Sequence, residues 1–228
     1  MLKPSDFFEL DRFEYADIFD DCEFVWDALK KIGNYVRKKK MNSIYGRVHP
    51  TAVIEGSEIY IGRNTIVGPH VYIQSPTIIG DNCEVRQGAY IRGNCIAGQG
   101  SIIGHATEVK NSLFLNDSHA PHFNYVGDSV LGNGTNLGAG TKLSNYKISK
   151  EKQIKLQIEG KVYDTGLDKF GAILGDHSES GCNSVLAPGT IVSKNCWIYP
   201  NSYVRGFIYE GTIIKLSKNN QHSVLRHI

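Results

Sequence analysis

Apolar residues recur at every sixth position through the middle of the chain. Positions 61, 67, 73, 79, 85, 91, 97, 103, 109 and 115 carry Ile, Val, Ile, Ile, Val, Ile, Ala, Ile, Val and Leu. Two residues earlier stands a small or β-branched residue, such as Thr65, Cys83 or Ser101, and glycine often follows the apolar position. Each hexad therefore predicts a very short strand with two inward side chains, followed by a turn that glycine eases. Three such hexads make one triangular coil of a parallel β-helix.

Two stretches depart from the six-residue spacing. The first is HAPHFNYVGD, residues 119–128, which we expect to protrude from a corner of the coil as a loop. The spacing then returns at Tyr125, Leu131, Leu137 and Leu143. The second departure, near residues 144–171, contains QIKLQIEGKVYDT, which alternates around Glu159 and Gly160 and predicts a β-hairpin. The repeat resumes after this insertion at Leu174, Leu186, Val192, Ile198 and Val204.

A helical pattern precedes the repeat. Apolar residues at helical spacing predict an amphipathic helix over residues 23–39, with Asp20 or Asp21 as its cap and a lysine run at its end. The predicted organisation is therefore an N-terminal helical segment (1–44), a parallel β-helix with one insertion (45–206) and a C-terminal tail (207–228). The expected fold class is all-β.

Composition narrows the function classes only slightly. The 228 residues carry a net charge of +2, so nothing favours a nucleic-acid partner. The acidic N-terminal residues do not resemble a secretory signal, and no apolar run approaches the twenty or so residues of a membrane span. The five cysteines form no CxxC pair, which favours a reducing cytoplasm. Three of them occupy small inward slots and are predicted to be buried thiols: Cys83, Cys95 and Cys196.

Stacking places chemically informative residues beside one another. Residues eighteen apart lie in adjacent coils, about 4.8 Å apart, so Gln74, Arg92 and Lys110 form one column. Two stacked cations repel each other unless an anion shares the site or both side chains extend into water. The column therefore indicates either a pair of solvated charges or a phosphate clamp, in which arginine gives a bidentate grip and lysine a point charge.

A second column predicts an interface. Ile78, Ile96 and Phe114 fall at outward positions of one face, and an exposed apolar strip of this kind marks a covered surface. Two occupants remain open at this point: the N-terminal helix of the same chain, or a neighbouring subunit.

The motifs from Arg92 onward resemble a known family. HATEVKNS (105–112), PHFNYVGD (121–128) and NLGAGTKLSNY (136–146) are similar to the acetyltransferase domain of the bifunctional bacterial enzyme that makes UDP-N-acetylglucosamine, a hexapeptide-repeat acyltransferase. The similarity covers residues 90–206 and is most specific over 92–146. It implies a left-handed parallel β-helix, an exception to the usual right-handed crossover, and a homotrimer with sites between subunits.

The resemblance also implies roles for individual residues. Arg92 and Lys110 would bind the phosphate of an amino-sugar 1-phosphate, with Tyr125 beside them, and Asn136 would contact the sugar. His122 would be the general base, and Ala139, Asn145 and Tyr146 would bind acetyl-CoA, the acyl donor. No metal is required. The backbone N–H groups of LGAG (137–140) are candidates for the oxyanion hole, because glycine lets the backbone approach closely. His119 has no expected role and is predicted to be an exposed loop histidine.

Several positions depart from the family pattern. Pro121 replaces a glycine before the histidine, Cys182 replaces a serine that contacts the coenzyme, and Gly171 stands where a lysine is expected, with Lys169 nearby. The loop after Tyr146 is about one coil longer. The uridyltransferase domain has no counterpart in this sequence, so nucleotidyl transfer is not expected.

Three alternatives remain open. A γ-class carbonic anhydrase needs three histidines around zinc, whereas His105 is expected on a different corner from His119 and His122. A regulatory protein would keep a sugar-phosphate site without the reaction. A transferase acting on a nucleotide-linked amino sugar would use the same clamp, because the clamp recognises only phosphate.

Overall fold

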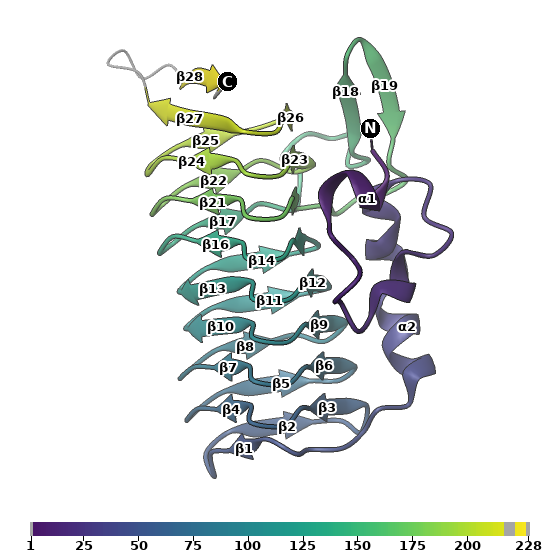
Figure 1. The fold of residues 1–228 in the computed structure, drawn as a ribbon, viewed down its shortest axis with the longest axis vertical. Coiled ribbons are helices and arrows are strands. Elements are labelled where there is room, and N and C mark those ends of the chain that lie inside the picture. The colour runs from purple at the N-terminus through teal and green to yellow at the C-terminus, as the bar shows by residue number, and fades with distance from the viewer. Residues whose placement is uncertain (1, 217–221, 227–228) are drawn as a thin grey trace.

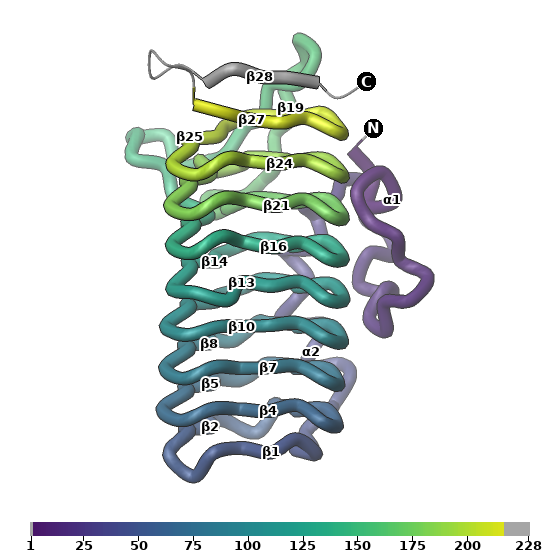
Figure 2. Tube along the Cα trace, turned by 60° about the vertical axis from the view of Figure 1, so that its left-hand side comes forward, coloured from purple at the N-terminus to yellow at the C-terminus, as the bar shows by residue number. Residues whose placement is uncertain are grey.

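The hexads fold into a stack of triangular coils. The computed structural model describes residues 2–216 and 222–226, and within them each coil passes once through each of three parallel sheets (Figure 1). We call these sheets face one, face two and face three, in the order in which the chain first enters them. Figure 2 shows the strands of face one as a ladder along the whole length of the stack.

Face one has ten strands among the described residues: β1 (Arg47–Val48), β4 (Ile66–Val67), β7 (Glu84–Val85), β10 (Ile102–His105), β13 (His119–His122), β16 (Asn136–Leu137), β21 (Glu179–Ser180), β24 (Trp197–Ile198), β27 (Thr212–Leu216) and β28 (His222–Arg226). The last of them, β28, pairs antiparallel with β27. The coil thus continues through β27, beyond the last hexad that the sequence pattern identifies.

Faces two and three have eight strands each within the described part of the chain. Face two comprises β2 (Val53–Glu55), β5 (Tyr72–Gln74), β8 (Tyr90–Ile91), β11 (Glu108–Lys110), β14 (Tyr125–Gly127), β17 (Lys142–Leu143), β22 (Val185–Leu186) and β25 (Tyr203–Val204). Face three comprises β3 (Ile59–Ile61), β6 (Thr77–Ile79), β9 (Cys95–Ala97), β12 (Ser112–Phe114), β15 (Val130–Leu131), β20 (Ala172–Leu174), β23 (Thr190–Val192) and β26 (Phe207–Ile208).

The inward side chains form one continuous apolar core. Ile61, Ile73, Val109 and Leu137 in this core are all fully buried. Several small inward residues satisfy their polar groups within the coil: the hydroxyl of Thr65 donates to the carbonyl of Gly80 at 2.7 Å, and that of Thr107 to the carbonyl of Ala120 at 3.0 Å. Cys83, Cys95 and Cys196 are buried as predicted, and burial raises the pKa of each thiol, to about 11 for Cys83 and about 12 for Cys95.

The register corrects one predicted column. Ile79 pairs with Ala97 eighteen residues later, but Ala97 pairs with Phe114 and Phe114 with Leu131, seventeen residues apart in each case. A shift of one residue turns a strand's side chains to the opposite face. Phe114 therefore lies inside the coil, and Leu113 takes the outward position beside Ile96.

The stretch 119–128 is also part of the coil, so the predicted protruding loop is wrong. His119–His122 form β13 in face one, Tyr125–Gly127 form β14 in face two, and the inward residues are Ala120 and Val126, both fully buried. Tyr125 faces outward. The six-residue beat breaks here because the coil is one residue shorter, and not because a loop bulges out of it.

The N-terminal segment covers face three. Its elements are α1 (Pro4–Phe7), η1 (Ala16–Phe19), η2 (Val25–Lys30) and α2 (Ile32–Lys39), and Figure 1 shows them lying along one side of the stack. The predicted single helix over 23–39 is wrong, since a 3₁₀ helix and an α-helix meet at Lys31. The N-cap of η2 is Phe24, whose backbone N–H donates to the Asp27 carboxylate at 2.9 Å, and not the expected Asp20 or Asp21.

Apolar and polar contacts hold this segment in place. Trp26, Ile32 and other buried residues of the segment form one cluster with the outward residues Ile78, Ile96 and Leu113 of face three. The apolar strip is thus covered by the same chain and not by a neighbouring subunit. Asp176, which is 1% exposed, accepts hydrogen bonds from the backbone N–H groups of Glu9 and Asn133, both at 2.7 Å, and so ties the segment to a corner of the coil.

The insertion contains the predicted hairpin. β18 (Lys155–Ile158) and β19 (Lys161–Asp164) pair antiparallel around Glu159 and Gly160, which both have positive φ angles of 48° and 76°. Two successive residues with positive φ are typical of a type I′ turn, which matches the twist of the flanking strands. Leu156 and Ile158 join the apolar cluster formed by the N-terminal segment and face three.

We expect Trp26→Ala to lower the free energy of unfolding by about 3–5 kcal/mol, as removal of a buried tryptophan usually does. The indole is 1% exposed and stacks on Phe24 with ring centroids 4.7 Å apart. Chemical denaturation followed by circular dichroism measures the change. Trp197, which is 50% exposed, provides the control, and Trp197→Ala should alter stability by less than about 0.5 kcal/mol. Equal unfolding midpoints for the two variants would show that the N-terminal segment contributes nothing to the folded state.

Candidate functional site

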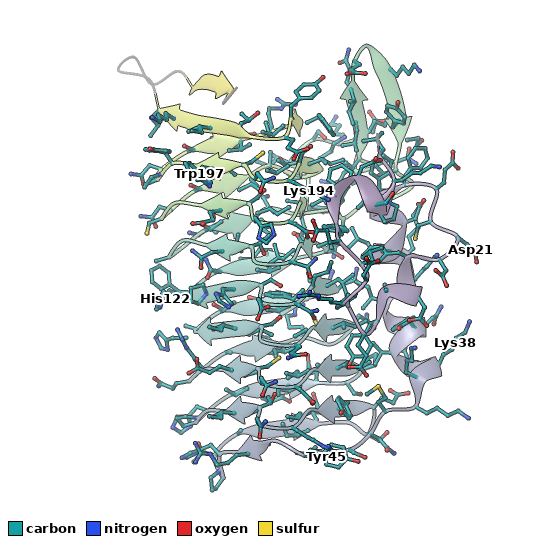
Figure 3. The ribbon with its side chains drawn as sticks, viewed as in Figure 1. Asp21, Lys38, Tyr45, His122, Lys194 and Trp197 are labelled. Carbon is teal, nitrogen blue, oxygen red and sulfur yellow. The ribbon has the colours of Figure 1, made fainter. Side chains whose placement is uncertain are left out.

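The edge between face one and face two carries His122. Figure 3 shows this residue on the side of the stack away from the N-terminal segment. His105 pairs directly with His122 in the adjacent coil, which corrects the expectation that the two histidines stand on different corners. The backbone N–H of Gly140 donates to the carbonyl of His122, and that of Asn183 to the carbonyl of Ala139. One column therefore runs His105, His122, Ala139 and Cys182, and we call it the histidine edge.

The His122 imidazole is exposed at this edge. The backbone N–H of His122 donates to the side-chain oxygen of Asn124 at 3.1 Å, which fixes the main chain beside it. The next residue, Phe123, has a φ of 39°, a conformation that costs energy for a bulky side chain. Nδ1 of the His105 ring lies 3.0 Å from the carbonyl of Gln87, and because a carbonyl oxygen can only accept, Nδ1 is the donor in this hydrogen bond.

Asn136 and His119 are neighbours on face one, next to the histidine edge. They pair in register, and Asn136 pairs in turn with Glu179 of the following coil. His119 is half-buried in β13, so it is not the exposed loop histidine that the sequence predicts. Both side chains lie on the same outward column, three residues before His122 and Ala139 respectively.

Arg92 and Lys110 occupy the opposite edge of face two, between face two and face three. They lie in adjacent coils, because Val109 pairs with Ile91. The guanidinium of Arg92 donates to the Glu108 carboxylate at 2.8 Å, and this hydrogen bond raises the pKa of Arg92. Its side chain is 41% exposed. Arg92 therefore has a carboxylate partner within the chain and remains accessible to solvent.

Lys110 belongs to a more buried network centred on Asp128, whose side chain is 5% exposed. The Asp128 carboxylate accepts hydrogen bonds from Lys110 Nζ at 3.0 and 3.1 Å, from Asn111 Nδ2 at 2.9 Å and from Asn145 Nδ2 at 2.5 Å. The sequence pattern did not identify Asp128 as a residue of the site. The signal available for it was its position one coil above Asn111, at the turn that follows the Tyr125 strand.

Tyr125 lies against the same network. A Cβ atom added at Gly127 would come within 2.7 Å of the Tyr125 hydroxyl and 2.8 Å of Asn145 Nδ2, so both groups lie over this glycine. Burial raises the pKa of Tyr125, and the neighbouring carboxylate of Glu108 acts in the same direction. The glycine therefore creates the space in which a tyrosine hydroxyl and an asparagine amide meet. We call Arg92, Lys110, Tyr125 and Asn145 the cationic edge.

The two edges are separated by the width of face two. His105 and Lys110 are five residues apart along one coil, a span of at most roughly 17 Å. The predicted acceptor-binding residues Arg92, Lys110 and Tyr125 thus come together, with Asn145 among them. The predicted base His122 lies with Ala139 and Cys182 on the far edge, and Asn136 lies beyond it on face one. Tyr146, 48% exposed, begins the insertion, and Lys152 Nζ lies 4.2 Å from its ring centroid.

Within residues 2–216 and 222–226, no group of three or more His, Cys, Asp or Glu side chains is arranged to hold a metal ion. Over the same residues, every helix is too short or too polar to cross a membrane.

Two curated relatives match this chain through part of their own length. The bifunctional protein GlmU of Methanocaldococcus jannaschii is 35% identical over 196 residues, which cover 86% of this chain and 47% of that protein. The bifunctional sugar-1-phosphate nucleotidylyltransferase/acetyltransferase of Sulfurisphaera tokodaii is 37% identical over 114 residues, which cover 50% of this chain and 28% of that protein. The chain thus spans about half the length of these relatives, or less. The matches confirm the resemblance that the motifs indicate.

A solved structure shares the fold. The UDP-N-acetylglucosamine acyltransferase of Francisella novicida aligns with 81% of this chain and 70% of its own, with a TM-score of 0.50 and 16% identity. This likeness and the three parallel sheets confirm the predicted left-handed parallel β-helix of hexapeptide repeats. The family model described as the GMPPB C-terminal domain matches residues 41–163, which is more than half of the chain, and the protein therefore belongs to the GMPPB C-terminal domain family.

Proposed function

We propose that the protein transfers an acetyl group from acetyl-CoA to the amino group of an amino-sugar 1-phosphate similar to glucosamine 1-phosphate. The arrangement of the two edges carries this proposal. Stacking brings His122, Ala139 and Cys182 into one column, and it brings Arg92, Lys110, Tyr125 and Asn145 together on the other edge of the same face. The family motifs assign His122 to the base and Arg92, Lys110 and Tyr125 to the acceptor phosphate. They assign Ala139, Cys182 and Asn145 to the donor, so donor residues stand on both edges.

The chemistry needs a base and an activated acyl group. The sugar amine attacks the thioester carbonyl, His122 accepts the proton of the amine, and the C–S bond breaks as the coenzyme thiolate leaves and is protonated. His122 is accessible for this task because its imidazole is exposed. The backbone N–H groups of Gly138 and Gly140 already donate to the carbonyls of Ser180 and His122, so neither of these LGAG donors is free to bind the oxyanion.

The separation of the edges supports a site shared between copies. An amine held by the phosphate clamp on the cationic edge lies a face width away from His122 of the same chain. A homotrimer in which the cationic edge of one copy faces the histidine edge of the next would bring the two groups together. The apolar strip of face three is not the contact between copies, because the N-terminal segment covers it. The five free cysteines support a reducing compartment such as the cytoplasm.

One observation favours a second candidate, a sugar-phosphate-binding protein without catalysis. Glu108 and Asp128 already neutralise Arg92 and Lys110, so a phosphate would have to compete with a carboxylate for each cation. Arg92 is the more available of the two because its ion pair is exposed. The reaction and simple binding differ in their dependence on His122.

We expect Arg92→Ala to weaken binding of glucosamine 1-phosphate by about 1.5–3 kcal/mol, the usual worth of a hydrogen bond to a charged group. Isothermal titration calorimetry measures the change. The matched control is Arg86→Ala, since Arg86 also pairs with a carboxylate, Glu84, at 2.8 Å, but outside the cationic edge. Lys110→Ala should weaken binding similarly, and it should also lower stability because it leaves Asp128 buried without its cation. If Arg92→Ala binds glucosamine 1-phosphate with unchanged affinity, Arg92 and Lys110 form only structural ion pairs and no phosphate site.

We expect His122→Ala to reduce turnover by roughly 10²–10⁴-fold, the typical share of general-base catalysis, while both substrates still bind. Release of free coenzyme thiol in the presence of amino-sugar 1-phosphates measures the rate, and UDP-linked amino sugars tested in parallel identify the acceptor. His119→Ala is the control in the same strand and should retain nearly full turnover. Full turnover in His122→Ala removes this residue as the base. A parent protein that binds the sugar phosphate but releases no thiol with any acceptor favours the binding protein.

We expect light scattering to give three times the 25.3 kDa mass of the chain. Mixed trimers then test whether sites are shared. If His122 and Arg92 of one site come from different copies, mixing His122→Ala chains with Arg92→Ala chains should restore about a quarter of the sites. A monomer at micromolar concentration contradicts the trimer, and a mixture that is no more active than its parts contradicts the shared site.

A further inference from the structure

The insertion and the last coils enclose a cavity of about 760 Å³. Ser144 and residues 146–149 and 155–158 of the insertion form one wall, and the other wall is formed by residues of faces two and three between 185 and 191 and between 203 and 207. We call this cavity the insertion pocket. Its volume lies within the range of small-molecule sites, roughly 300–1,000 Å³. None of the residues that the proposed reaction assigns to the acceptor phosphate or to the base lines it.

The pocket is cationic. Lys147, Lys155 and Arg205 line it, and no Asp or Glu is among the lining residues. Lys155 pairs with Glu151 at 3.0 Å in an exposed ion pair, and Lys147 Nζ donates to the carbonyl of Gln153 at 2.6 Å. Arg205 is exposed and makes no hydrogen bond or ion pair with any other described residue. A guanidinium left available at the rim of a pocket is suited to a bidentate grip on a phosphate.

The remaining lining is apolar and aromatic. Val185, Ala187 and Pro188 provide an apolar wall from the coil. Tyr146 and Tyr203 also line the pocket and are 48% and 51% exposed, and Lys152 Nζ lies over the Tyr146 ring at 4.2 Å from its centroid. Exposed tyrosine rings beside cations suit a ligand that has a flat aromatic group next to an anionic one.

The pocket continues the cationic edge. The backbone N–H of Ser144 donates to the carbonyl of Leu186, and that of Ala187 to the carbonyl of Val204, so Ser144, Ala187 and Arg205 stack above one another. Gly127 lies beneath Ser144 and pairs with Lys110. Lys110 is thus two coils below the level of Ser144, or roughly 10 Å.

We propose that the insertion pocket binds a nucleoside diphosphate group, with the base against the tyrosine rings and the phosphates near Arg205 and Lys155. Aromatic surface together with the available guanidinium of Arg205 favours such a group over a simple anion or an apolar ligand. Coenzyme A and a nucleotide-linked sugar both contain this group, and the pocket chemistry is the same for both. ADP binding does not depend on acetyl transfer; only the assignment of the pocket to coenzyme A rests on the proposed function, which already places Tyr146 with the acyl donor.

Calorimetry with ADP as the probe tests the proposal. ADP should bind the parent protein, and inorganic pyrophosphate and adenosine should each bind at least tenfold more weakly, because each lacks one half of the group. Arg205→Ala should weaken ADP binding at least tenfold. Val185→Trp, which fills the pocket from an outward position of β22, should abolish it. The matched control is Lys161→Ala, since Lys161 is an exposed lysine of the same hairpin that does not line the pocket.

Absence of ADP binding overturns the proposal, as does equal binding of pyrophosphate, or ADP binding that survives both Arg205→Ala and Val185→Trp. Competition identifies the source of the group: displacement of ADP by coenzyme A alone assigns the pocket to the acyl donor, and displacement by UDP-N-acetylglucosamine alone assigns it to a nucleotide sugar. His122→Ala and Arg92→Ala should leave ADP binding unchanged. The two proposals, acetyl transfer and nucleotide binding at the insertion pocket, can therefore be disproved independently of each other.

Discussion

Backbone hydrogen bonds between successive coils fix the height of each coil and, with it, the neighbours of every side chain. The N–H of Phe123 donates to His105, that of Gly140 to His122 and that of Asn183 to Ala139, so residues far apart in sequence become a single column. Each bond joins one coil to the next at the strand spacing of about 4.8 Å. Because the inward slots are filled by apolar and small residues, the outward columns are free to vary in chemistry. The candidate site is built entirely from such columns.

Coil length decides which columns form. Two successive coils have seventeen residues instead of eighteen between Ala97, Phe114 and Leu131. The shorter coils bring His105 and His122 into register and place Tyr125 outward, beside Asn145 and over Gly127. They also place Asp128 where it accepts hydrogen bonds from Lys110, Asn111 and Asn145. A buried carboxylate with three donors holds its partners in fixed positions, since breaking one contact leaves a charge uncompensated in a poorly solvated place.

The N-terminal segment and the insertion share the task of covering face three. Their apolar residues surround Ile78, Ile96 and Leu113, and Asp176 anchors the first of them through Glu9. The N-terminal segment lies against face three, whereas both edges of the candidate site lie on face two. The same insertion leaves a cationic pocket over the last coils. One segment thus extends the apolar cluster on one side and forms a wall of the cationic pocket on the other.

The amino-acid pattern alone determined the β-helix, the position of the insertion and its hairpin, and the burial of Cys83, Cys95 and Cys196. These features follow from the six-residue spacing of apolar residues and from side-chain size, and both can be read from the amino-acid sequence without knowledge of the fold. The pattern also placed Arg92 above Gln74 and below Lys110, because the coils there keep eighteen residues.

Only the tertiary structure decided the rest. Counting in sixes put Phe114 outside and His105 on another corner. Leu113 and Leu115, which flank Phe114 and face outward against the N-terminal segment, are also apolar, so the apolar pattern does not reveal that the coil is one residue shorter. The sequence pattern also did not identify Glu108 and Asp128 as carboxylate partners of the two cations. Nor did it decide which segment covers face three. Each depends on contacts between segments distant in the chain, and such contacts are fixed by the register of the coils and by the packing of the N-terminal segment. Local propensity does not determine them.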